Sequence, residues 1–141
     1  MTNFSRLHLP LLLFDALIAH ARREYPNECC GLLAGAIADD CGRVARHFPI
    51  RNERASPVEY FTNARDLLDA MKAMRSDGAE PLAIYHSHPL CDPIPSKHDV
   101  AQNTWGETVM HVIVGLAKPE PELRAWWIGE TVYREAEMEI A

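Results

Sequence analysis

Apolar residues recur at every third or fourth position between residues 10 and 25, which is the spacing of one buried helix face. This face consists of Leu13, Leu17, Ala21 and Tyr25, with Phe14 and Ile18 beside it. Pro10 suits the first turn of a helix because its missing N–H would have no intrahelical partner there. The pattern therefore predicts a helix over residues 10–25.

A second helical pattern covers residues 63–75. Its apolar face consists of Leu67, Ala70, Met71 and Met74. Asn63 together with Asp66 is typical of a capped helix start, and Gly78 follows where the helix should end. A third, shorter helix is expected over residues 97–105.

Short apolar runs between turn residues predict the strands. Residues 29–35 and 43–50 form a predicted hairpin whose turn contains Asp39, Asp40 and Gly42. The other predicted strands cover residues 58–61, 82–85, 109–116, 123–128 and 131–139. The last of these alternates only loosely, so residues 130–141 are expected to form a final strand or a frayed tail. Two long helices among about six strands predict an α/β fold with a single mixed β-sheet flanked by helices.

The chain has 141 residues, which is the size of one domain. We therefore expect a single domain over residues 1–141, with a core of about 6–129. The 20 Asp and Glu residues outnumber the 14 Lys and Arg residues, which leaves a net charge of −6 at pH 7. Non-specific binding to nucleic acid depends on cations that neutralise phosphates, so this composition argues against a nucleic-acid partner.

The apolar run that starts at Leu9 resembles part of a signal peptide, but Asp15 interrupts it and Arg6 is the only preceding cation. No run approaches the roughly 18 apolar residues that a membrane span needs. The cysteines form no C-x-x-C pair; they are Cys29, Cys30, Cys41 and Cys91. We therefore expect reduced, mostly buried thiols in a cytoplasmic protein without a membrane partner.

His86 and His88 are the first candidates for chemistry. They lie two positions apart at the end of the predicted strand 82–85, so their imidazoles should point to the same face. Two imidazoles supply half of a tetrahedral metal site. A pair with this spacing also arises by chance in a chain with seven histidines, so the pair alone does not establish a metal site.

Asp99 follows His88 by eleven residues, and three prolines between them turn the chain rather than extend it. Two histidines and a returning carboxylate form the three-ligand set of a catalytic zinc site, which leaves the fourth position for water. Ser96-x-x-Asp99 is also typical of a helix N-terminal cap. Both interpretations can hold, because a helix that begins at Ser96 would fix the direction of the Asp99 side chain.

A metal-bound water needs a base for its proton, since metal binding lowers its pKa only to about 7. Glu28 is the candidate because it lies at the junction between the predicted helix 10–25 and the apolar strand 29–35. The alternative is that Glu28 is an ordinary solvated glutamate at a junction.

These residues resemble the JAMM signature, which is also called the MPN+ metalloprotease motif. That signature is a distant Glu, then H-[ST]-H-P, six residues, and S-x-x-D. The chain matches it at Glu28, at residues 86–89 and at residues 96–99, with six residues between the last two segments. Residues 19–35 and 52–57 also resemble small prokaryotic members, and the resemblance extends to about residue 129.

The resemblance implies a JAMM/MPN fold, which is cytidine-deaminase-like, and one zinc ion per chain. His86, His88 and Asp99 would bind this zinc. Glu28 would accept a proton from the zinc-bound water and later pass it to the departing amine. Ser96 would donate a hydrogen bond to the oxygen that becomes negative in the intermediate. The nucleobase deaminase signature, H-x-E with P-C-x-x-C, is absent from the sequence, so nucleobase chemistry is not expected.

Three residues within or beside the motif also have expected roles. Ser87 should point away from the face of the two histidines and is expected to be structural. His98 is expected to face solvent. Cys91 lies in the loop between the ligands and is either a bystander thiol or an inhibitory fourth zinc ligand.

A free-standing domain of this size resembles the family members that process ubiquitin-like sulfur-carrier proteins. The implied reaction is hydrolysis of an amide or isopeptide bond at the C-terminus of the carrier, whose extended tail would add beside a sheet edge. Two alternatives stay open: a non-catalytic MPN scaffold, and a general zinc peptidase that acts on short peptides. The sequence also allows a homodimer, and it does not identify the carrier or the leaving group.

Overall fold

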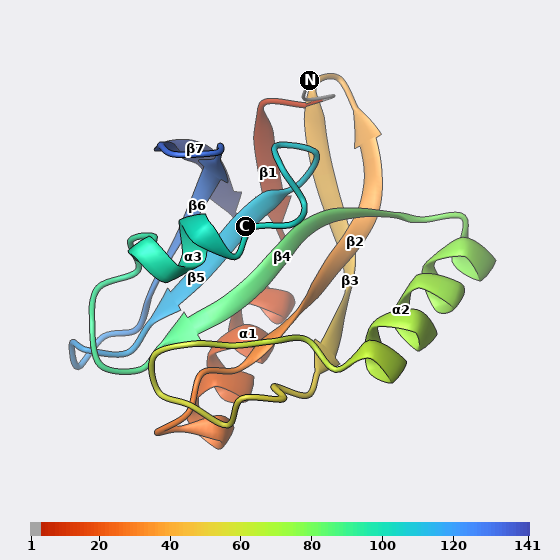
Figure 1. The fold of residues 1–141 in the computed structure, drawn as a ribbon. Coiled ribbons are helices and arrows are strands. Elements are labelled where there is room, and N and C mark those ends of the chain that lie inside the picture. Colours follow the sequence, from red (N-terminus) through yellow and green to blue (C-terminus); the bar gives the residue numbers. More distant parts are fainter. Residues whose placement is uncertain (1–3) are drawn as a thin grey trace.

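The computed structural model describes residues 4–141, which contain seven strands and three helices (Figure 1). The strands are β1 (Arg6–Leu9), β2 (Cys30–Ala38), β3 (Cys41–Ile50), β4 (Glu80–His88), β5 (Met110–Gly115), β6 (Glu122–Ile128) and β7 (Tyr133–Ile140). The helices are α1 (Leu11–Glu24), α2 (Ala64–Asp77) and α3 (Lys97–Ala101). The two long predicted helices are confirmed, because α1 and α2 match the predicted ranges closely.

The strands form one closed barrel in the order β1-β3-β2-β4-β5-β6-β7. β1 closes it, because this strand pairs in parallel with both β3 and β7. β4 and β5 also run parallel, whereas the other neighbouring strands run antiparallel. The predicted mixed α/β sheet is therefore confirmed. The prediction of a sheet that is simply flanked by helices needs correction, since the sheet curls until its first and last strands pair.

Closure of the barrel also affects the expected mode of substrate binding. A closed sheet removes the unpaired edge strands that an extended peptide could join. Within residues 4–141, every barrel strand has a partner on both sides. Pairing is incomplete along some strands, however, because β1 pairs with β3 only over residues 41–43 and leaves residues 44–50 with β2 as their strand partner. The addition of a substrate tail beside a sheet edge therefore stays a prediction.

The two strands that close the barrel are the ones that the sequence pattern describes least well. β1 was not predicted, since Arg6–Leu9 is too short to show a period and its partners lie far along the chain. β7 (Tyr133–Ile140) pairs with both β6 and β1, so the frayed-tail alternative for residues 130–141 is wrong. The barrel thus extends beyond the predicted core limit of residue 129.

Apolar side chains pack on both faces of the barrel strands. Along β2, Leu33 belongs to one cluster and Leu32 to another, because neighbouring strand residues point to opposite faces. Leu17 of α1 packs into the first cluster, and Met74 of α2 packs into the second. Val100 of α3 packs against a small third cluster on β5 and β6. Figure 1 shows α2 outside the barrel, where it contacts β3 and β4.

The caps of α2 lie at the predicted residues, whereas α3 is shorter than predicted. The side chain of Asn63 accepts a hydrogen bond from the Asp66 N–H, and Gly78 ends α2 with a φ of 68°. α3 ends at Ala101, before the predicted limit. Just beyond this end, the side-chain amide of Asn103 donates to the Ile128 carbonyl of β6.

The loop between β3 and α2 is held by one side chain rather than by strand pairing. The Asn52 amide donates to the backbone carbonyls of Glu28 and Glu59, and its oxygen accepts from the Phe61 N–H. This loop contains a single isolated bridge, so the predicted strand over residues 58–61 is wrong. Because Asn52 also holds the Glu28 carbonyl, the loop is tied to the start of β2.

No helix within residues 4–141 is both long and apolar enough to cross a membrane. All four cysteines are free thiols. Cys91 is exposed, whereas Cys29, Cys30 and Cys41 are buried. The prediction of unpaired, mostly buried thiols is therefore confirmed.

Candidate metal centre

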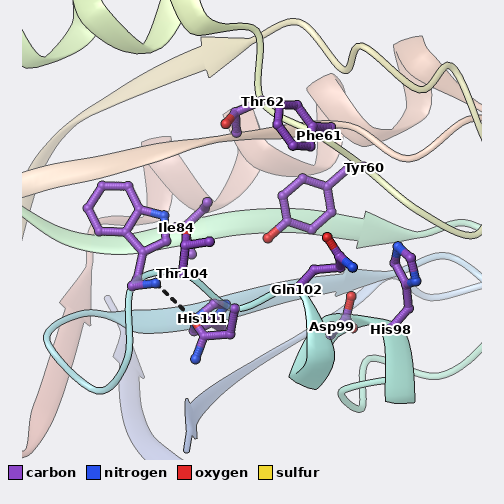
Figure 2. Close-up of a pocket in the computed structure, with 11 residues that line it drawn as sticks. Tyr60, Phe61, Thr62, Ile84, His98, Asp99, Gln102, Thr104 and His111 are labelled. Atoms are coloured by element: carbon purple, nitrogen blue, oxygen red, sulfur yellow. Dashed lines mark hydrogen bonds between the residues drawn. The ribbon is translucent and has the colours of Figure 1, made fainter. Parts of the chain in front are cut away.

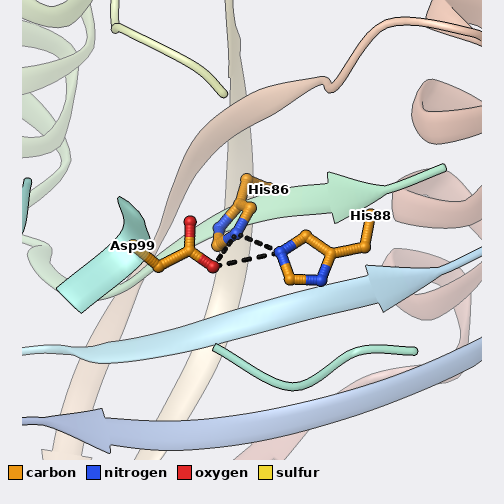
Figure 3. A group of neighbouring side chains, drawn as sticks. All are labelled: His86, His88 and Asp99. Carbon is orange, nitrogen blue, oxygen red and sulfur yellow. Dashed lines mark hydrogen bonds and ion pairs between the residues drawn. The ribbon is translucent and has the colours of Figure 1, made fainter. Parts of the chain in front are cut away.

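Two histidines at the end of β4 and one aspartate of α3 converge on one point (Figure 3). His86 Nε2 lies 3.2 Å from His88 Nε2 and 3.2 Å from Asp99 Oδ2. His88 Nε2 lies 3.0 Å from the same Asp99 oxygen. All three residues are buried. The structure thus brings together the three side chains that the sequence nominated as metal ligands.

β4 holds the two imidazoles on one face of the barrel. This strand is paired on both sides, with His86 opposite Cys30 of β2 and Ile113 of β5, and with His88 opposite Gly115. Because both neighbouring strands fix the backbone, the orientation of the two imidazoles is preorganised.

Ser96 and Asp99 form a capping box at the start of α3. The Asp99 N–H donates to Ser96 Oγ over 3.0 Å, and the Ser96 N–H donates to Asp99 Oδ2 over 2.9 Å. Asp99 Oδ2 is therefore held by the helix start and directed at both histidines at once. The helix-cap interpretation of this pair is confirmed, and it coexists with the convergence on the histidines.

His88 is held in the tautomer that a metal ligand needs. Its Nδ1 lies 2.9 Å from the carbonyl oxygen of Asp92, so Nδ1 donates, and when the ring is neutral Nε2 keeps the lone pair that a metal would bind. Burial lowers the pKa of His88, but the hydrogen bonds with Asp99 and Asp92 outweigh burial and raise the pKa above its usual value. A proton and a metal ion therefore compete for the same lone pair of His88.

An aromatic contact holds the His86 ring, whose second ring nitrogen makes no hydrogen bond among the described residues. The Tyr60 ring stacks on its imidazole with the ring centroids 4.6 Å apart and an angle of 26° between the planes. His86 Nδ1 is buried and finds no hydrogen-bond partner within residues 4–141. Nothing in the local sequence pattern of its loop predicts that Tyr60 lies beside β4.

The donor set fits a zinc ion. Burial would raise the pKa of Asp99, but the facing His86 and the hydrogen bonds from both histidines hold that pKa well below its usual range. The carboxylate is therefore ionised, and two imidazoles with one carboxylate leave an open position on a tetrahedral zinc. Zinc–ligand bonds of about 2.0–2.2 Å space tetrahedral ligand atoms about 3.3 Å apart or slightly more. The three observed separations of 3.0–3.2 Å come close to this spacing.

Glu28 lies just before β2 with an exposed fraction of 3%, so the alternative of a solvated junction glutamate is wrong. Its N–H donates to the Ser56 carbonyl, and its own carbonyl accepts from Asn52. Its Oε1 is buried and has no hydrogen-bond partner among the described residues. Burial raises the pKa of Glu28 to about 9, and the charges of Asp99 and Glu59 add to this rise. The Glu28 carboxyl therefore lies in the electrostatic field of the candidate ligands.

The neighbours of the motif behave largely as expected. Ser87 Oγ accepts a hydrogen bond from the Cys29 N–H over 2.8 Å, which ties β4 to the residue before β2 and supports a structural role for Ser87. The His98 side chain is 42% exposed and lies 3.6 Å from Glu59 Oε2. Cys91 is exposed and lies outside the group of converging donors, so the bystander interpretation is the better supported one.

His111, which the sequence motif does not include, lies on β5 opposite Ile84. His111 is 2% exposed, and neither of its ring nitrogens has a hydrogen-bond partner in the described part of the chain. Burial lowers the pKa of His111 to about 3, and the charge of His86 adds to this effect. The ring is therefore neutral. Only the register of β4 against β5 reveals that His111 lies near the metal ligands.

Residues 10–129 match the protein family described as prokaryotic homologs of the JAB domain. The CysO-cysteine peptidase of Mycobacterium tuberculosis is 38% identical over 117 residues, which cover 82% of this chain and 78% of that protein. The probable TtuB-protein conjugate cleaving protease of Thermus thermophilus is 38% identical over 110 residues, which cover 77% of this chain and 70% of that protein. The solution structure of a protein from Desulfitobacterium hafniense matches with a TM-score of 0.87 and 32% identity, covering 96% of this chain and 92% of that chain.

Proposed function

The chain belongs to the family of prokaryotic JAB-domain homologues, and from this membership we propose that it is a zinc metallopeptidase. Its reaction is the hydrolysis of an amide or isopeptide bond at the C-terminus of a ubiquitin-like sulfur-carrier protein. The names of two relatives support this substrate class, since one is a peptidase for CysO-cysteine and the other cleaves TtuB-protein conjugates.

The observation that supports the proposal most directly is the convergence of His86 Nε2, His88 Nε2 and Asp99 Oδ2 within hydrogen-bond distance of one another. These three atoms would hold one zinc ion per chain. When bound there, zinc supplies Lewis acidity that polarises a carbonyl and lowers the pKa of water to about 7.

Glu28 serves as the general base. Its carboxyl is buried, the charge of Asp99 contributes to its raised pKa, and its Oε1 is free of protein partners within residues 4–141. A cation held by the three ligands would oppose the influence of Asp99 and lower the raised pKa of Glu28, which favours the carboxylate form that a base needs. The carboxylate then accepts a proton from the attacking water and delivers it to the amine that departs.

Ser96 serves as a hydrogen-bond donor to the scissile carbonyl oxygen. Its Oγ accepts from the Asp99 N–H, so its own hydroxyl proton is not used by that contact. Donation of this proton stabilises the charge that develops on the carbonyl oxygen. Loss of one such donor typically costs about 10²–10³ in kcat.

The proposal is tested with a carrier protein that is fused through its C-terminus to a reporter. Zinc-loaded wild-type chain should release the reporter. Glu28→Gln should retain stoichiometric zinc by elemental analysis but lose nearly all turnover, whereas His88→Ala should lose both. Glu24→Gln, an exposed glutamate at the end of α1, is the matched control. Full turnover by Glu28→Gln would show that the assignment of the base is wrong.

Two further measurements separate the alternatives. A non-catalytic scaffold would purify without stoichiometric zinc even when grown with the metal. A general peptidase would cleave the isolated tail peptide as fast as the folded carrier fusion. The proposed function requires zinc and a faster reaction with the folded carrier.

A further inference from the structure

A pocket of about 130 Å³ lies beside the candidate metal centre (Figure 2). Tyr60 reaches it from the loop before α2, and Asp99 and Gln102 reach it from α3 and its C-cap. Ile84 and His111 reach it from the neighbouring strands β4 and β5. Because Asp99 belongs both to the pocket and to the ligand group, the pocket adjoins the point where the chemistry is proposed to occur.

The pocket contains a polar group that the protein does not satisfy. His111 is 98% buried, and both of its ring nitrogens lack a hydrogen-bond partner within residues 4–141. A neutral imidazole offers one donor and one acceptor. Buried polar groups in proteins are nearly always paired, so an unpaired one at a pocket calls for a ligand or water that completes it.

The size of the pocket limits its occupant to a small group. Pockets for drug-sized molecules measure about 300–1,000 Å³. An engineered cavity of about 150 Å³ takes up benzene, which has six heavy atoms. A pocket of about 130 Å³ therefore accepts one small side chain, and it is too small for an extended protein tail to pass through.

The charge of the pocket favours a neutral occupant. Neither Lys nor Arg is among the described residues that line it, so an acidic side chain would find no strong cation there. The His98 side chain at the pocket already faces Glu59. The Asp99 carboxylate is directed at the two histidines, so a basic side chain would have to compete with them for it.

We propose that this pocket is a specificity subsite for the residue that leaves. It binds a small, neutral, hydrogen-bonding side chain, such as that of threonine, serine, cysteine or asparagine, next to the scissile bond, and His111 pairs with its polar atom. The folded carrier and its tail lie on the other side of the bond, since the pocket cannot contain them. This inference rests on the proposed peptidase function.

The test uses carrier fusions that end in one additional residue after the tail. Threonine and valine have the same shape but differ in one hydrogen-bonding group, so their comparison isolates the polar contact. Wild-type chain should cleave the threonine fusion with a kcat/KM at least about tenfold above that of the valine fusion. Aspartate and tryptophan fusions should react more slowly than threonine.

His111→Leu removes both unpaired nitrogens and should bring the threonine-to-valine ratio to within about twofold. The variant leaves no protein partner unsatisfied, so it should fold with at least the thermal stability of the wild type. His47→Leu, on β3 and outside the pocket lining, is the matched control and should keep the wild-type ratio. An unchanged ratio in His111→Leu would overturn the inference.

A measurement that needs no turnover separates this inference from the proposed function. Free L-threonine, but not free L-valine, should shift the imidazole ¹⁵N resonances of His111 in the full chain. If no fusion is cleaved but threonine shifts His111, the peptidase function fails together with the leaving-residue role, and only the preference of the pocket for a polar side chain stands. If fusions are cleaved without preference and His111 does not respond, the subsite fails and the peptidase function stands.

Discussion

The Tyr60 phenol ring lies against the His86 imidazole, with the ring centroids 4.6 Å apart. This contact joins a loop without strand structure to a candidate metal ligand near the end of β4. It takes the role that a hydrogen bond to the second ring nitrogen usually has in metal-binding histidines. His86 Nδ1 lacks such a bond within residues 4–141.

Removal of the Tyr60 ring should weaken metal binding. Tyr60→Ala frees the His86 ring to rotate and should raise the zinc Kd by about tenfold or more, as expected for loss of an orienting contact. Tyr60→Phe keeps the ring and should stay within about twofold of the wild type. Competition with a chromophoric chelator measures both. Equal affinities in all three proteins would mean that β4 alone orients His86.

Ser96 should have two separable effects. Ser96→Ala removes the N-cap of α3 and should lower the free energy of unfolding by about 1 kcal/mol. The same change should lower kcat by about 10² through loss of the hydroxyl donor. Ser96→Thr retains the hydroxyl and should restore most of both, as measured by urea unfolding and steady-state kinetics. A loss of stability without a loss of kcat would limit Ser96 to the capping role.

Glu28 should make the stability of the zinc-free protein depend on pH. Burial, followed by Asp99 and Glu59, raises its pKa from 4.5 to about 9, so the folded chain keeps a proton that the unfolded chain releases. The stability from this group is complete below pH 4.5 and is lost as the pH rises through about 9.

This dependence is measured by urea unfolding in the presence of a chelator. Between about pH 5 and pH 8, the wild type should lose at least about 1 kcal/mol more than Glu28→Gln, which cannot titrate. The comparison cancels the contribution of the histidines to the pH dependence of the free energy of unfolding, because both proteins contain the same histidines. Parallel pH profiles would contradict the raised pKa of Glu28.

Gly115 on β5 should affect zinc binding without contacting the ligand atoms. A Cβ at this position would lie 2.6 Å from Pro93 Cδ, so alanine must displace the loop that contains Asp92. The Asp92 carbonyl accepts from His88 Nδ1, and its displacement should raise the zinc Kd by about tenfold. Gly129→Ala, where the nearest atom would be 3.3 Å away, is the control. Unchanged affinity in Gly115→Ala would show that the loop adapts freely.

Much of the local structure follows from short-range patterns. Helical spacing predicts α1 and α2, because the apolar faces that define them repeat within a few residues. The two-residue spacing of His86 and His88 predicts that both lie on one face, since strand geometry alternates with period two. The Ser96-x-x-Asp99 pattern predicts the cap of α3 for the same reason, as its hydrogen bonds span a single helical turn.

Long-range features do not follow from such patterns. The closure of the barrel depends on β1 pairing with β7, which lies at the opposite end of the chain, and sheet curvature accumulates over all the strands between them. The stacking of Tyr60 on His86, the burial of Glu28 and the position of His111 depend on which distant segments pack together. The sequence by itself, through the fixed geometry of strands and helices, therefore determines which face of its own element each candidate ligand lies on. Packing between distant segments sets their distances, their protonation and the shape of the pocket beside them.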